Sequence, residues 1–471
     1  MLGHVLSLAV LILLPACTLA DAQLAITDVS TKIDLRSQLV KTVHTIRVIN
    51  NGDAEATYFE VHFPEPTKGS YAFHRCVMDK TAMILRDVTE VDASRTPSAD
   101  TKVVKLKTPI SAGQEATITL RTVVTHAYLA FPAEIAQQAD QYMKYSFQNY
   151  FSTPYEVNSQ TVTVSGEKII TVNDSPHKGK KESELTVGPY KSISADAEMS
   201  YTTVIVKNNA PFLVAKKFVR EISVSHWQRV KIDDILSLHH DGAKLQGHFS
   251  RVDFQRARNQ APAAIQGWKT HLPVEARDFD YRDEVGNIST SSVSSSLSGH
   301  TLTLIPRFPI FGGWSSGYML NYTLDNANHL ASDGNGNYQF KVPLVPHVYD
   351  NMIVDDLELR VALPEGATDI TVKNKFGFDE QTFDVKHTYL DVGGRPVVVL
   401  TKANVVNDHE ADFEIKYSLS SGAIYRQPLV LIAAYFCLFS LLIIYLRSDF
   451  TIESKSHAVV PKQEVTQKKK V

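Results

Sequence analysis

The sequence predicts a mainly β protein, in which two tandem lumenal β-sandwich-like domains are followed by one transmembrane helix. Three observations lead to this fold class. Short stretches of alternating apolar and polar residues recur between residues 43 and 363, a long apolar run lies near the C-terminus, and a shorter one lies at the N-terminus. Alternation with a period of two is typical of strands with one buried face. Many short strands separated by polar turns favour antiparallel sandwiches.

The N-terminal apolar run has the layout of a secretory signal peptide. Residues 5–14 are apolar and uncharged, and small residues follow, so cleavage is expected after Ala20 or Ala22. We assign residues 1–22 to this signal. The residues that end at Cys17 also fit a bacterial lipoprotein box. The second membrane segment near the C-terminus makes an additional lipid anchor unnecessary.

The strand pattern runs through most of the chain. A turn signal at residues 50–53 (NNGD) closes the first clear stretch. One helix is expected at residues 132–142, because proline suits the first position of a helix. The stretches with the clearest alternation are residues 43–49, 57–63, 116–124, 160–164, 219–224 and 356–363.

The segment 208–217 (NNAPFLVAKK) interrupts this pattern and suggests a domain boundary. About 400 residues between the two apolar runs suffice for two domains of ordinary size. We therefore predict a first lumenal β-rich domain at residues 23–215 and a second at residues 216–427. No internal repeat aligns, and the one biased stretch is the serine-rich segment 289–298.

Residues 429–446 form a continuous apolar run without an ionised side chain, flanked by Arg426 and Arg447. At a rise of about 1.5 Å per residue, the run covers roughly 27 Å, close to the thickness of a bilayer's hydrocarbon core. A buried core helix of this length would carry a polar stripe, and this run carries none. We assign residues 428–446 to a transmembrane helix.

The charges behind the span predict its orientation. The residues after Leu446 hold six Lys or Arg against three acids. Together with a cleaved signal, this excess of basic residues places residues 447–471 in the cytosol as a short tail. The bulk of the chain is then lumenal.

Composition limits the classes of partner and of fold. The chain has 48 basic and 51 acidic residues, a balance that argues against nucleic acid as a partner. Cys17 leaves with the signal and Cys437 lies in the span, so Cys76 is the one lumenal cysteine. An intrachain disulfide is therefore excluded there, and the fold must rest on a hydrophobic core. Cys76 is expected to be a buried, inert thiol, with a bridge to another chain as the alternative.

One local pattern resembles the nucleophile elbow of serine hydrolases. Residues 313–317 (GWSSG) match G-x-S-x-G with Ser315 as the nucleophile. An elbow needs a helix after the serine, so that the hydroxyl is presented above oxyanion donors. The residues that follow alternate like a strand, so the glycines are expected to serve a turn.

Two acidic or histidine-containing patterns resemble metal sites. Asp278 and Asp280 form Asp-x-Asp, which holds a divalent cation in many sugar transferases, but arginines flank the pair and no nucleotide-binding βαβ unit surrounds it. We expect an ion-paired surface turn. His239, His240 and Asp241 are adjacent and lack a spaced further ligand, so a surface location is expected here too. The sequence thus indicates no catalytic residue, no metal site and no cofactor.

A cluster of aromatic residues leaves two readings open. Exposed rings could stack on sugar faces or on extended peptide, whereas rings beside a helix are more often part of a core. The cluster consists of Tyr142, Tyr145, Phe147, Tyr150, Phe151 and Tyr155.

Several ordered segments carry a family resemblance. Residues 247–255 (GHFSRVDFQ) resemble a stretch of ribophorin I. The other segments that resemble this family are residues 224–227 (VSHW), 281–290 (YRDEVGNIST), 306–314 (PRFPIFGGW), 363–367 (LPEGA), 389–399 (YLDVGGRPVVV) and the span with the following RSDF at residues 447–450. Each match is weak alone, but their order from about residue 210 to residue 450 makes the set specific.

The resemblance implies a structural, non-catalytic subunit of the oligosaccharyltransferase complex of the endoplasmic reticulum membrane. That complex transfers an oligosaccharide from dolichyl diphosphate to asparagine in Asn-x-Ser/Thr of entering polypeptides. Other subunits would be its partners, including the multi-span subunit that holds the catalytic site and its metal, and contact with nascent polypeptide stays open. Animal members carry a long helical cytosolic extension that these residues do not match, so contacts attributed to it are not carried over.

Two other classes of function are kept as alternatives. A membrane-anchored lumenal hydrolase would depend on Ser315. A free-standing cargo or glycan-binding receptor would use the aromatic cluster and would purify alone from mild detergent.

The sequence also predicts two kinds of signal. Lys468 and Lys469 lie fourth and third from the C-terminus and resemble a dilysine retrieval signal for the endoplasmic reticulum, the alternative being an ordinary basic tail near anionic lipid. Three sequons are expected in the lumen, and we rank Asn287 first because it lies at an expected turn. Asn321 comes second because strand pairing would occlude it, and Asn173 third because of its acidic middle residue and the following proline.

Overall fold

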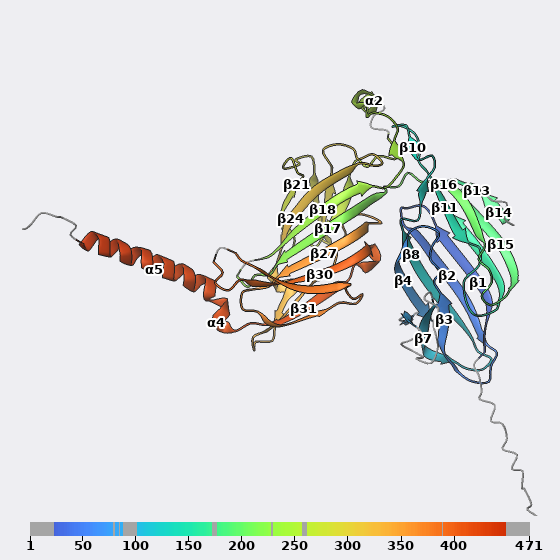
Figure 1. Cartoon of the computed structure of the whole chain (residues 1–471), viewed down its shortest axis with the longest axis horizontal. Coiled ribbons are helices and arrows are strands. Elements are labelled where there is room, and N and C mark those ends of the chain that lie inside the picture. The colour runs from blue at the N-terminus through green and yellow to red at the C-terminus, as the bar shows by residue number, and fades with distance from the viewer. Residues whose placement is uncertain are drawn as a thin grey trace, which may run out of the picture.

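The computed structural model describes residues 23–78, 81–83, 85–87, 101–171, 177–227, 229–256, 261–388 and 390–448. Two β-rich bodies lie side by side, and a single long helix projects from the C-terminal one (Figure 1). The predicted fold class, mainly β with one apolar C-terminal helix, is confirmed. The predicted signal peptide and most of the predicted tail lie outside the described residues.

The N-terminal body is built on an eight-stranded sheet with the order β14-β15-β12-β1-β2-β8-β4-β5. Neighbouring strands are antiparallel except β1 and β12, which are parallel. The bounds are β1 Leu24–Asp34, β2 Val40–Asn50, β4 Ser70–Met78, β5 Thr81–Met83, β8 Glu115–Thr125, β12 Val157–Ser165, β14 His177–Lys181 and β15 Glu184–Ile193.

Two smaller sheets contribute to the two cores on this large sheet. One has the order β3-β7-β6, and the other has the order β13-β16-β11-β9. Their strands are β3 Ala56–His62, β6 Leu85–Asp87, β7 Thr101–Ile110, β9 Leu129–Ala130, β11 Tyr142–Gln148, β13 Ile169–Thr171 and β16 Tyr201–Lys207. The first sheet shares a core with the large sheet that includes Phe59 and Ile118, and the second shares a separate core that includes Met143 and Val164.

The C-terminal body contains a seven-stranded sheet with the order β21-β24-β18-β17-β27-β30-β29, in which β17 and β27 are parallel. A three-stranded sheet (β20-β23-β22) and a four-stranded sheet (β25-β26-β31-β28) share one core with it. The strands are β17 Leu213–Ser223, β18 Val230–His240, β20 Trp268–Leu272, β21 Arg277–Arg282, β22 Ser292–Ser296, β23 Gly299–Leu304, β24 Ser315–Leu324, β25 Leu330–Ser332, β26 Asn337–Pro343, β27 Ile353–Ala362, β28 Thr368–Lys373, β29 Glu380–Lys386, β30 Arg395–Val406 and β31 Asp412–Ser418.

The alternating stretches identified in the sequence all fall on strands, namely β2, β3, β8, β12, β17 and β27. The turn at residues 50–53 is also present, where Asn50 Nδ2 donates to the carbonyl of Ala54 (2.7 Å). Cys76 is fully buried with a free thiol, as expected, and burial raises its pKa to about 12. The fold therefore does rest on buried apolar surface.

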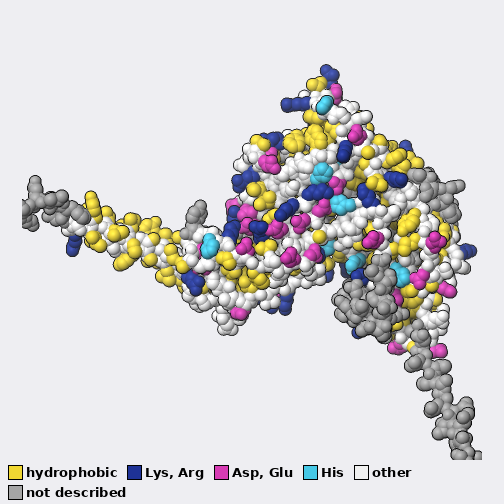
Figure 2. Space-filling model, viewed as in Figure 1, with side chains coloured by type: hydrophobic (Ala, Val, Ile, Leu, Met, Phe, Trp, Pro, Cys, Tyr) yellow, Lys and Arg dark blue, Asp and Glu magenta, His cyan; other side chains and the backbone are white. Residues whose placement is uncertain are grey.

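The described helices are few. They are α2 Arg251–Arg256, α3 Asn326–His329, the 3-10 turn η1 Asn407–His409, α4 Ser421–Ile424 and α5 Arg426–Arg447. Among the described residues, α5 is the one helix long and apolar enough to cross a membrane, and it contains the predicted span. Hydrophobic side chains cover it along its length (Figure 2).

The helix predicted at residues 132–142 is wrong. Residues 134–135 instead form β10 (Glu134–Ile135), which pairs in parallel with β19 (Lys244–Leu245). The backbone of Gln246 donates to the carbonyl of Ile135 (2.8 Å), so the groups that a helix would satisfy internally find partners about 110 residues away. Long-range pairing thus overrides the local preference.

Strand pairing changes partners near the predicted boundary. Strands up to β16 pair with one another, and strands from β17 onward pair with one another, apart from β10 with β19. The connection between β16 and β17 spans residues 208–212. The division into domains at residues 215 and 216 stays a prediction.

The two bodies share an apolar and polar contact surface, which we call the junction. Leu39 and Val123 from the N-terminal body form a buried cluster with Val214, Ile353 and Val406 from the C-terminal body. Polar bonds surround this cluster. They are Gln38 Nε2 to the carbonyl of Leu213 (2.9 Å), Thr125 Oγ1 to Asn404 Oδ1 (2.7 Å) and Arg121 Nη2 with Asp408 Oδ1 (2.9 Å).

Candidate functional site

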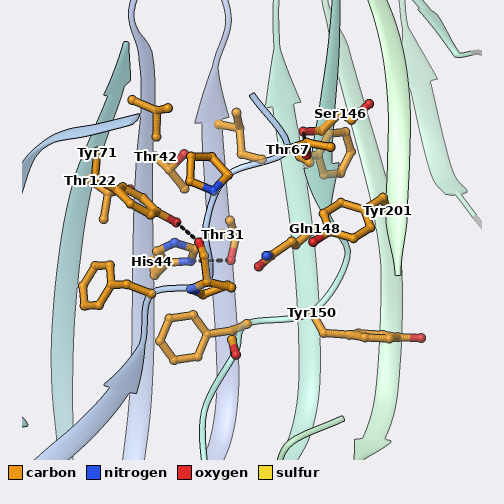
Figure 3. Close-up of a pocket in the computed structure, with 18 of the residues that line it drawn as sticks. Thr31, Thr42, His44, Thr67, Tyr71, Thr122, Ser146, Gln148, Tyr150 and Tyr201 are labelled. Carbon is orange, nitrogen blue, oxygen red and sulfur yellow. Dashed lines mark hydrogen bonds between the residues drawn. The ribbon is translucent and has the colours of Figure 1, made fainter. Parts of the chain in front are cut away.

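A cleft opens in the N-terminal body beside both of the smaller sheets. It encloses about 90 Å³. Its floor is the inner face of the large sheet, and its walls come from the segment after β3 and from β11 and β16 (Figure 3). The two hydrophobic cores of this body involve one small sheet each, and the cleft lies where they meet, because its lining includes Leu120 of one core and Ile33 of the other.

The floor of the cleft carries a band of polar residues, although it is the inside of a sandwich. Thr31, Thr42 and Thr122 are buried and lie on the neighbouring strands β1, β2 and β8. Thr31 Oγ1 is hydrogen-bonded to Nδ1 of His44 (2.9 Å). Within the described part of the chain, the hydroxyls of Thr42 and Thr122 have no hydrogen-bond partner. Because these two hydroxyls are not among the buried unpaired polar atoms of the described residues, they are open to the cleft, and the polar band is a candidate for binding a ligand.

His44 is uncharged at neutral pH. Burial lowers its pKa to about 4. Its ring lies 5.0 Å from the ring of Phe151, which fixes the imidazole against an apolar wall. The side chain can therefore exchange hydrogen bonds with a ligand but supplies no positive charge.

Aromatic rings line the walls. Phe147 and Phe151 are buried, and Tyr145, Tyr150 and Tyr201 line the cleft beside them. The core interpretation of the aromatic cluster is thus correct for the two phenylalanines. Tyr142 and Tyr155 do not line the cleft, and Tyr155 stacks on Phe59 in the neighbouring core (5.2 Å).

Lys68 and His62, which line the cleft, already have partners within the protein. Lys68 Nζ donates to the carbonyl of Tyr128, and Nδ1 of His62 lies 3.4 Å from Asp196. Neutral hydroxyls, a neutral imidazole and aromatic faces suit an uncharged ligand.

A second concentration of titratable groups lies at the junction. His126, which follows β8, approaches Asp241 through Nδ1 (3.1 Å) and Asp355 through Nε2 (2.7 Å). Lys216 Nζ lies 3.3 Å from Asp241 and 3.1 Å from Asp355. The hydrogen bonds to the two carboxylates raise the pKa of His126 to about 9, against the effect of burial. Burial opposes ionisation of Asp241, yet the bond from His126 and the charge of Lys216 lower its pKa to about 2. Two cations thus compensate two anions.

The elbow at Ser315 is absent, as the sequence indicated. Ser315 begins β24, so a strand rather than a helix follows it. Its Oγ is hydrogen-bonded to Nδ1 of His239 (2.9 Å), and Nε2 of His239 lies 3.5 Å from Asp241. Asp241 is already bound by His126 and Lys216. The elbow that the hydrolase alternative requires is therefore not formed, because β24 rather than a helix follows Ser315.

The expectation that residues 239–241 lie on the surface is wrong for His240. This residue is fully buried, with Nε2 2.9 Å from the carbonyl of Ala263 and Nδ1 accepting from the backbone of Gly242 (3.0 Å). Burial lowers its pKa to about 4. Adjacent positions on β18 alternate between core and surface, which separates His240 from His239.

Asp278 and Asp280 lie on the edge strand β21 rather than in a turn. Asp280 is paired with Arg282 (2.8 Å), and Asp278 accepts a hydrogen bond from Thr323 Oγ1 (2.8 Å). Among the described residues, no group of three or more His, Cys, Asp or Glu could hold a metal ion.

The sequons differ in their surroundings. Asn287 is exposed and follows Gly286 at a tight turn, where the backbone of Asp283 donates to the carbonyl of Gly286 (3.1 Å). Asn321 lies in the middle of β24, which pairs with β18 on one side and β21 on the other. Asn173, Lys468 and Lys469 lie outside the described residues.

Comparison with known proteins gives the family. A family model described as Ribophorin I matches residues 24–446. The chain belongs to the ribophorin I family. It is 33% identical to dolichyl-diphosphooligosaccharide–protein glycosyltransferase subunit 1A of Arabidopsis thaliana, over 94% of this chain and 74% of that one. It is 34% identical to subunit 1 of Caenorhabditis elegans, over 91% of this chain and 73% of that one, and 32% identical to Arabidopsis subunit 1B, over 96% and 99%.

Among solved structures, the chain is similar to an M1 zinc metallopeptidase from Deinococcus radiodurans. The identity is 12%, the TM-score is 0.27, and the match covers 44% of this chain and 42% of that chain. A similarity this low has no bearing on function.

The segments that resemble ribophorin I meet at two places in the structure. Residues 247–255 and 306–314 contribute Phe249 and Phe311, whose rings lie 5.5 Å apart. Residues 224–227, 363–367 and 389–399 contribute Trp227, Glu365 and Asp391, which all contact the start of α5 or the residues just before it.

Proposed function

We propose that this chain is a structural, non-catalytic subunit of the oligosaccharyltransferase complex in the endoplasmic reticulum membrane. Its relatives are named subunits of dolichyl-diphosphooligosaccharide–protein glycosyltransferase, and one apolar helix fits a single-pass anchor. In this role it supports the transfer of oligosaccharide from dolichyl diphosphate to Asn-x-Ser/Thr of nascent proteins. Its partners are the other subunits, including the multi-span catalytic one.

The observation that carries a scaffold role is the continuity of contacts along the chain. The N-terminal body is tied to the C-terminal body through the buried junction, and the C-terminal body is tied to α5 through Trp227, Glu365 and Asp391. A rigid connection of this kind holds distant surfaces at fixed positions relative to a membrane. Such a role needs no reacting groups of its own.

The test separates the amount of complex from its activity. In cells depleted of the endogenous chain, we expect less assembled complex and lower glycosylation of many secretory proteins. Cells rescued with Asp278→Ala plus Asp280→Ala, or with Ser315→Ala, should regain normal transfer per assembled complex. A complex that assembles normally but loses all transfer with any of these variants would overturn the non-catalytic role. Purification of the chain alone from mild detergent would favour a free-standing receptor.

The same proposal includes type I topology with the bulk of the chain lumenal. Glycosylation of this chain tests the topology, because sequons are modified on the lumenal side. Exposed Asn287 at a turn is expected to be modified, and Asn321 within a paired strand much less so. Endoglycosidase treatment and peptide mass mapping of chain from its native membrane measure the occupancy. A bare Asn287 contradicts the ranking, which places Asn173 last.

Retrieval to the endoplasmic reticulum is proposed to depend on Lys468 and Lys469. A reporter that carries residues 447–471 should leave the endoplasmic reticulum when both lysines become serine. Replacement of Lys470 and Lys462 is the matched control, because it removes the same charge and keeps the dilysine positions. Equal effects of the two pairs would reduce the tail to an ordinary basic segment.

A contact with nascent polypeptide is a second candidate function, favoured by the cleft. Its neutral hydroxyls and aromatic walls suit an extended, uncharged segment. A photo-crosslinking residue at Thr67, an exposed lining residue, should capture glycosylation substrates, whereas one at exposed Val285 should not. Equal capture at residues 67 and 285 would contradict a role of the cleft in binding nascent polypeptide.

A further inference from the structure

The connection between the C-terminal body and its membrane helix is short and packed. β31 ends at Ser418 and α5 begins at Arg426. Most of the intervening residues belong to α4, which Ser420 caps by accepting from the backbone of Ala423 (3.3 Å). Ala423 is part of the large core, and Ile424 packs against it. The helix is therefore not joined by a free linker.

Side chains from three separate segments bind the start of α5 or the end of α4. Gln427 Nε2 donates to Asp391 Oδ1 (2.7 Å), and Arg426 Nη1 lies 3.7 Å from Glu365. Trp227 Nε1 donates to the carbonyl of Ile424 (3.0 Å). Asp391 is also bound by Arg395 (3.2 Å), so the charges at this place are matched. These bonds fix the direction of α5 relative to the body.

Apolar and aromatic side chains are exposed around these same contacts. Trp227 is 58% exposed and Tyr425 is 53% exposed, with their rings 5.9 Å apart. Val392 and Leu390 are 72% and 38% exposed, and they flank the Asp391 that binds Gln427. We call these four residues the anchor rim.

The position of the bilayer follows from the helix. The uninterrupted apolar run begins at Leu429, three residues after Arg426, so Arg426 lies roughly 4–5 Å along the axis from the hydrocarbon core. The headgroup layer on each side is about 5–7 Å thick. Residues in direct contact with Arg426 and Gln427 are therefore at headgroup depth. Trp and Tyr are the residues that prefer this layer, because they combine an apolar body with a polar group.

We propose that the anchor rim inserts into the headgroup layer of the bilayer and seats the lumenal body on the membrane. The partner is a phospholipid surface, and insertion is driven by apolar burial since the neighbouring charges are paired with one another. It holds for the isolated chain in lipid and so does not depend on the proposed complex. It goes beyond a single-pass anchor because it gives the body a fixed height and tilt above the membrane.

A pair of matched positions tests the proposal. Val392→Cys and Val285→Cys are introduced into the full chain with Cys437→Ser, since Cys76 is buried. Val285 is 78% exposed, and its neighbour Glu284 lies against Gly317 near the start of β24. Trp227 lies near the other end of that strand, because Leu324 pairs with Val230. Gly317 and Leu324 are roughly 23 Å apart along the strand.

Each variant is labelled with an environment-sensitive fluorophore and reconstituted into phosphatidylcholine vesicles, with and without bromine on the acyl chains near the headgroup. We expect brominated lipid to quench the label at residue 392 at least two-fold and to leave the label at residue 285 unchanged. Equal quenching at the two positions, or none at residue 392, overturns the proposal. If either cysteine variant does not fold, the proposal is tested instead by the tryptophan fluorescence of the chain without added cysteines. The lipid-quenched part of the tryptophan emission must then disappear in Trp227→Phe, and its persistence there also overturns the proposal.

Discussion

His126 Nε2 lies 2.7 Å from Oδ1 of Asp355 and joins the end of β8 in the N-terminal body to β27 in the C-terminal body. The same ring also binds Asp241, and Lys216 bridges the two carboxylates. One imidazolium is thus shared by two anions across the junction.

We expect His126→Gln to loosen the junction by on the order of 2 kcal/mol, because it leaves two partly buried carboxylates with one cation. Hydrogen exchange measured by mass spectrometry should increase at residues 123–126 and 353–355. His248→Gln is the control, since His248 is exposed and its ring has no bond in the described structure. Unchanged exchange at both segments would contradict the role of the ion pairs.

The same contact predicts an alkaline loss of stability. The pKa of His126 is about 9 in the folded chain, above its usual 6.5, so its stabilisation is complete below pH 6.5. It is lost as pH rises from 6.5 through 9. Urea midpoints of the full chain in detergent should therefore fall between pH 7 and 9.5, and should fall less in His126→Gln. An equal decline in both chains would rule out His126 as the cause.

Three histidines that are neutral at pH 7 predict an opposite, acid-side loss of stability. Burial lowers the pKa of His44, His240 and His409 to about 4 each. Their contribution is present above pH 6.5 and is lost as pH falls from 6.5 towards 4, at up to about 1.4 kcal/mol per pH unit for each group. The urea midpoint should drop steeply in that range, and His44→Gln should reduce the slope by about a third. His248→Gln, as before, should leave the slope unchanged.

The sequence predicted the structure correctly where a single hydrophobic pattern was enough to identify the element. The strands around Ile46, Phe59 and Leu359 and the helix α5 follow from alternation and from an unbroken apolar run. The helix expected at residues 132–142 failed because its partners in β19 are remote in sequence. The junction could not be predicted from the sequence either, because His126, Asp241 and Asp355 meet only after both bodies have folded.

The polar floor of the cleft had a signal that the sequence analysis missed. Thr42 and His44 occupy the same alternate positions in β2 as Val40, Ile46 and Val48, which are all buried. Val40, Ile46 and Val48 are apolar, so two polar residues among them break the hydrophobic pattern. Such exceptions are concentrated at functional sites. The sequence alone could not place Thr42 or His44 in a cleft, because the cleft depends on how the two small sheets are arranged over the large one.

Valine at both Thr42 and Thr122 should not lower the stability of the chain, because these hydroxyls open to the cleft, have no partner in the described structure, and valine has the same shape. Thr31→Val is the matched control and should lower stability, since it removes the hydrogen bond to His44. Urea unfolding of the three chains at pH 7 measures both effects. A loss of stability in the double variant would mean that the hydroxyls are satisfied by bound water, and would refute the expectation.

The buried pair Arg220 and Asp234 should respond to the removal of one partner more than to the removal of both. Nη1 of Arg220 donates to both carboxylate oxygens at 2.8 and 2.7 Å, and both side chains are almost fully buried. Arg220→Met should cost about 3–5 kcal/mol, because it leaves the buried Asp234 carboxylate with the Tyr322 hydroxyl and without its cation. Adding Asp234→Leu should recover most of that loss. A double variant as unstable as the single one would show that the pair stabilises the fold directly.

The place of β31 in its sheet affects the order in which the chain can fold. This strand lies between β26 and β28 and buries Phe413, Ile415 and Tyr417 in the large core. A polypeptide is synthesised from its N-terminus, so the C-terminal core stays open until residues 412–418 have been made. The membrane helix starts at Arg426, immediately after these residues. Closure of the core is therefore followed closely by synthesis of the anchor, and a chain that is truncated before residue 412 lacks both the anchor and a central strand of this sheet.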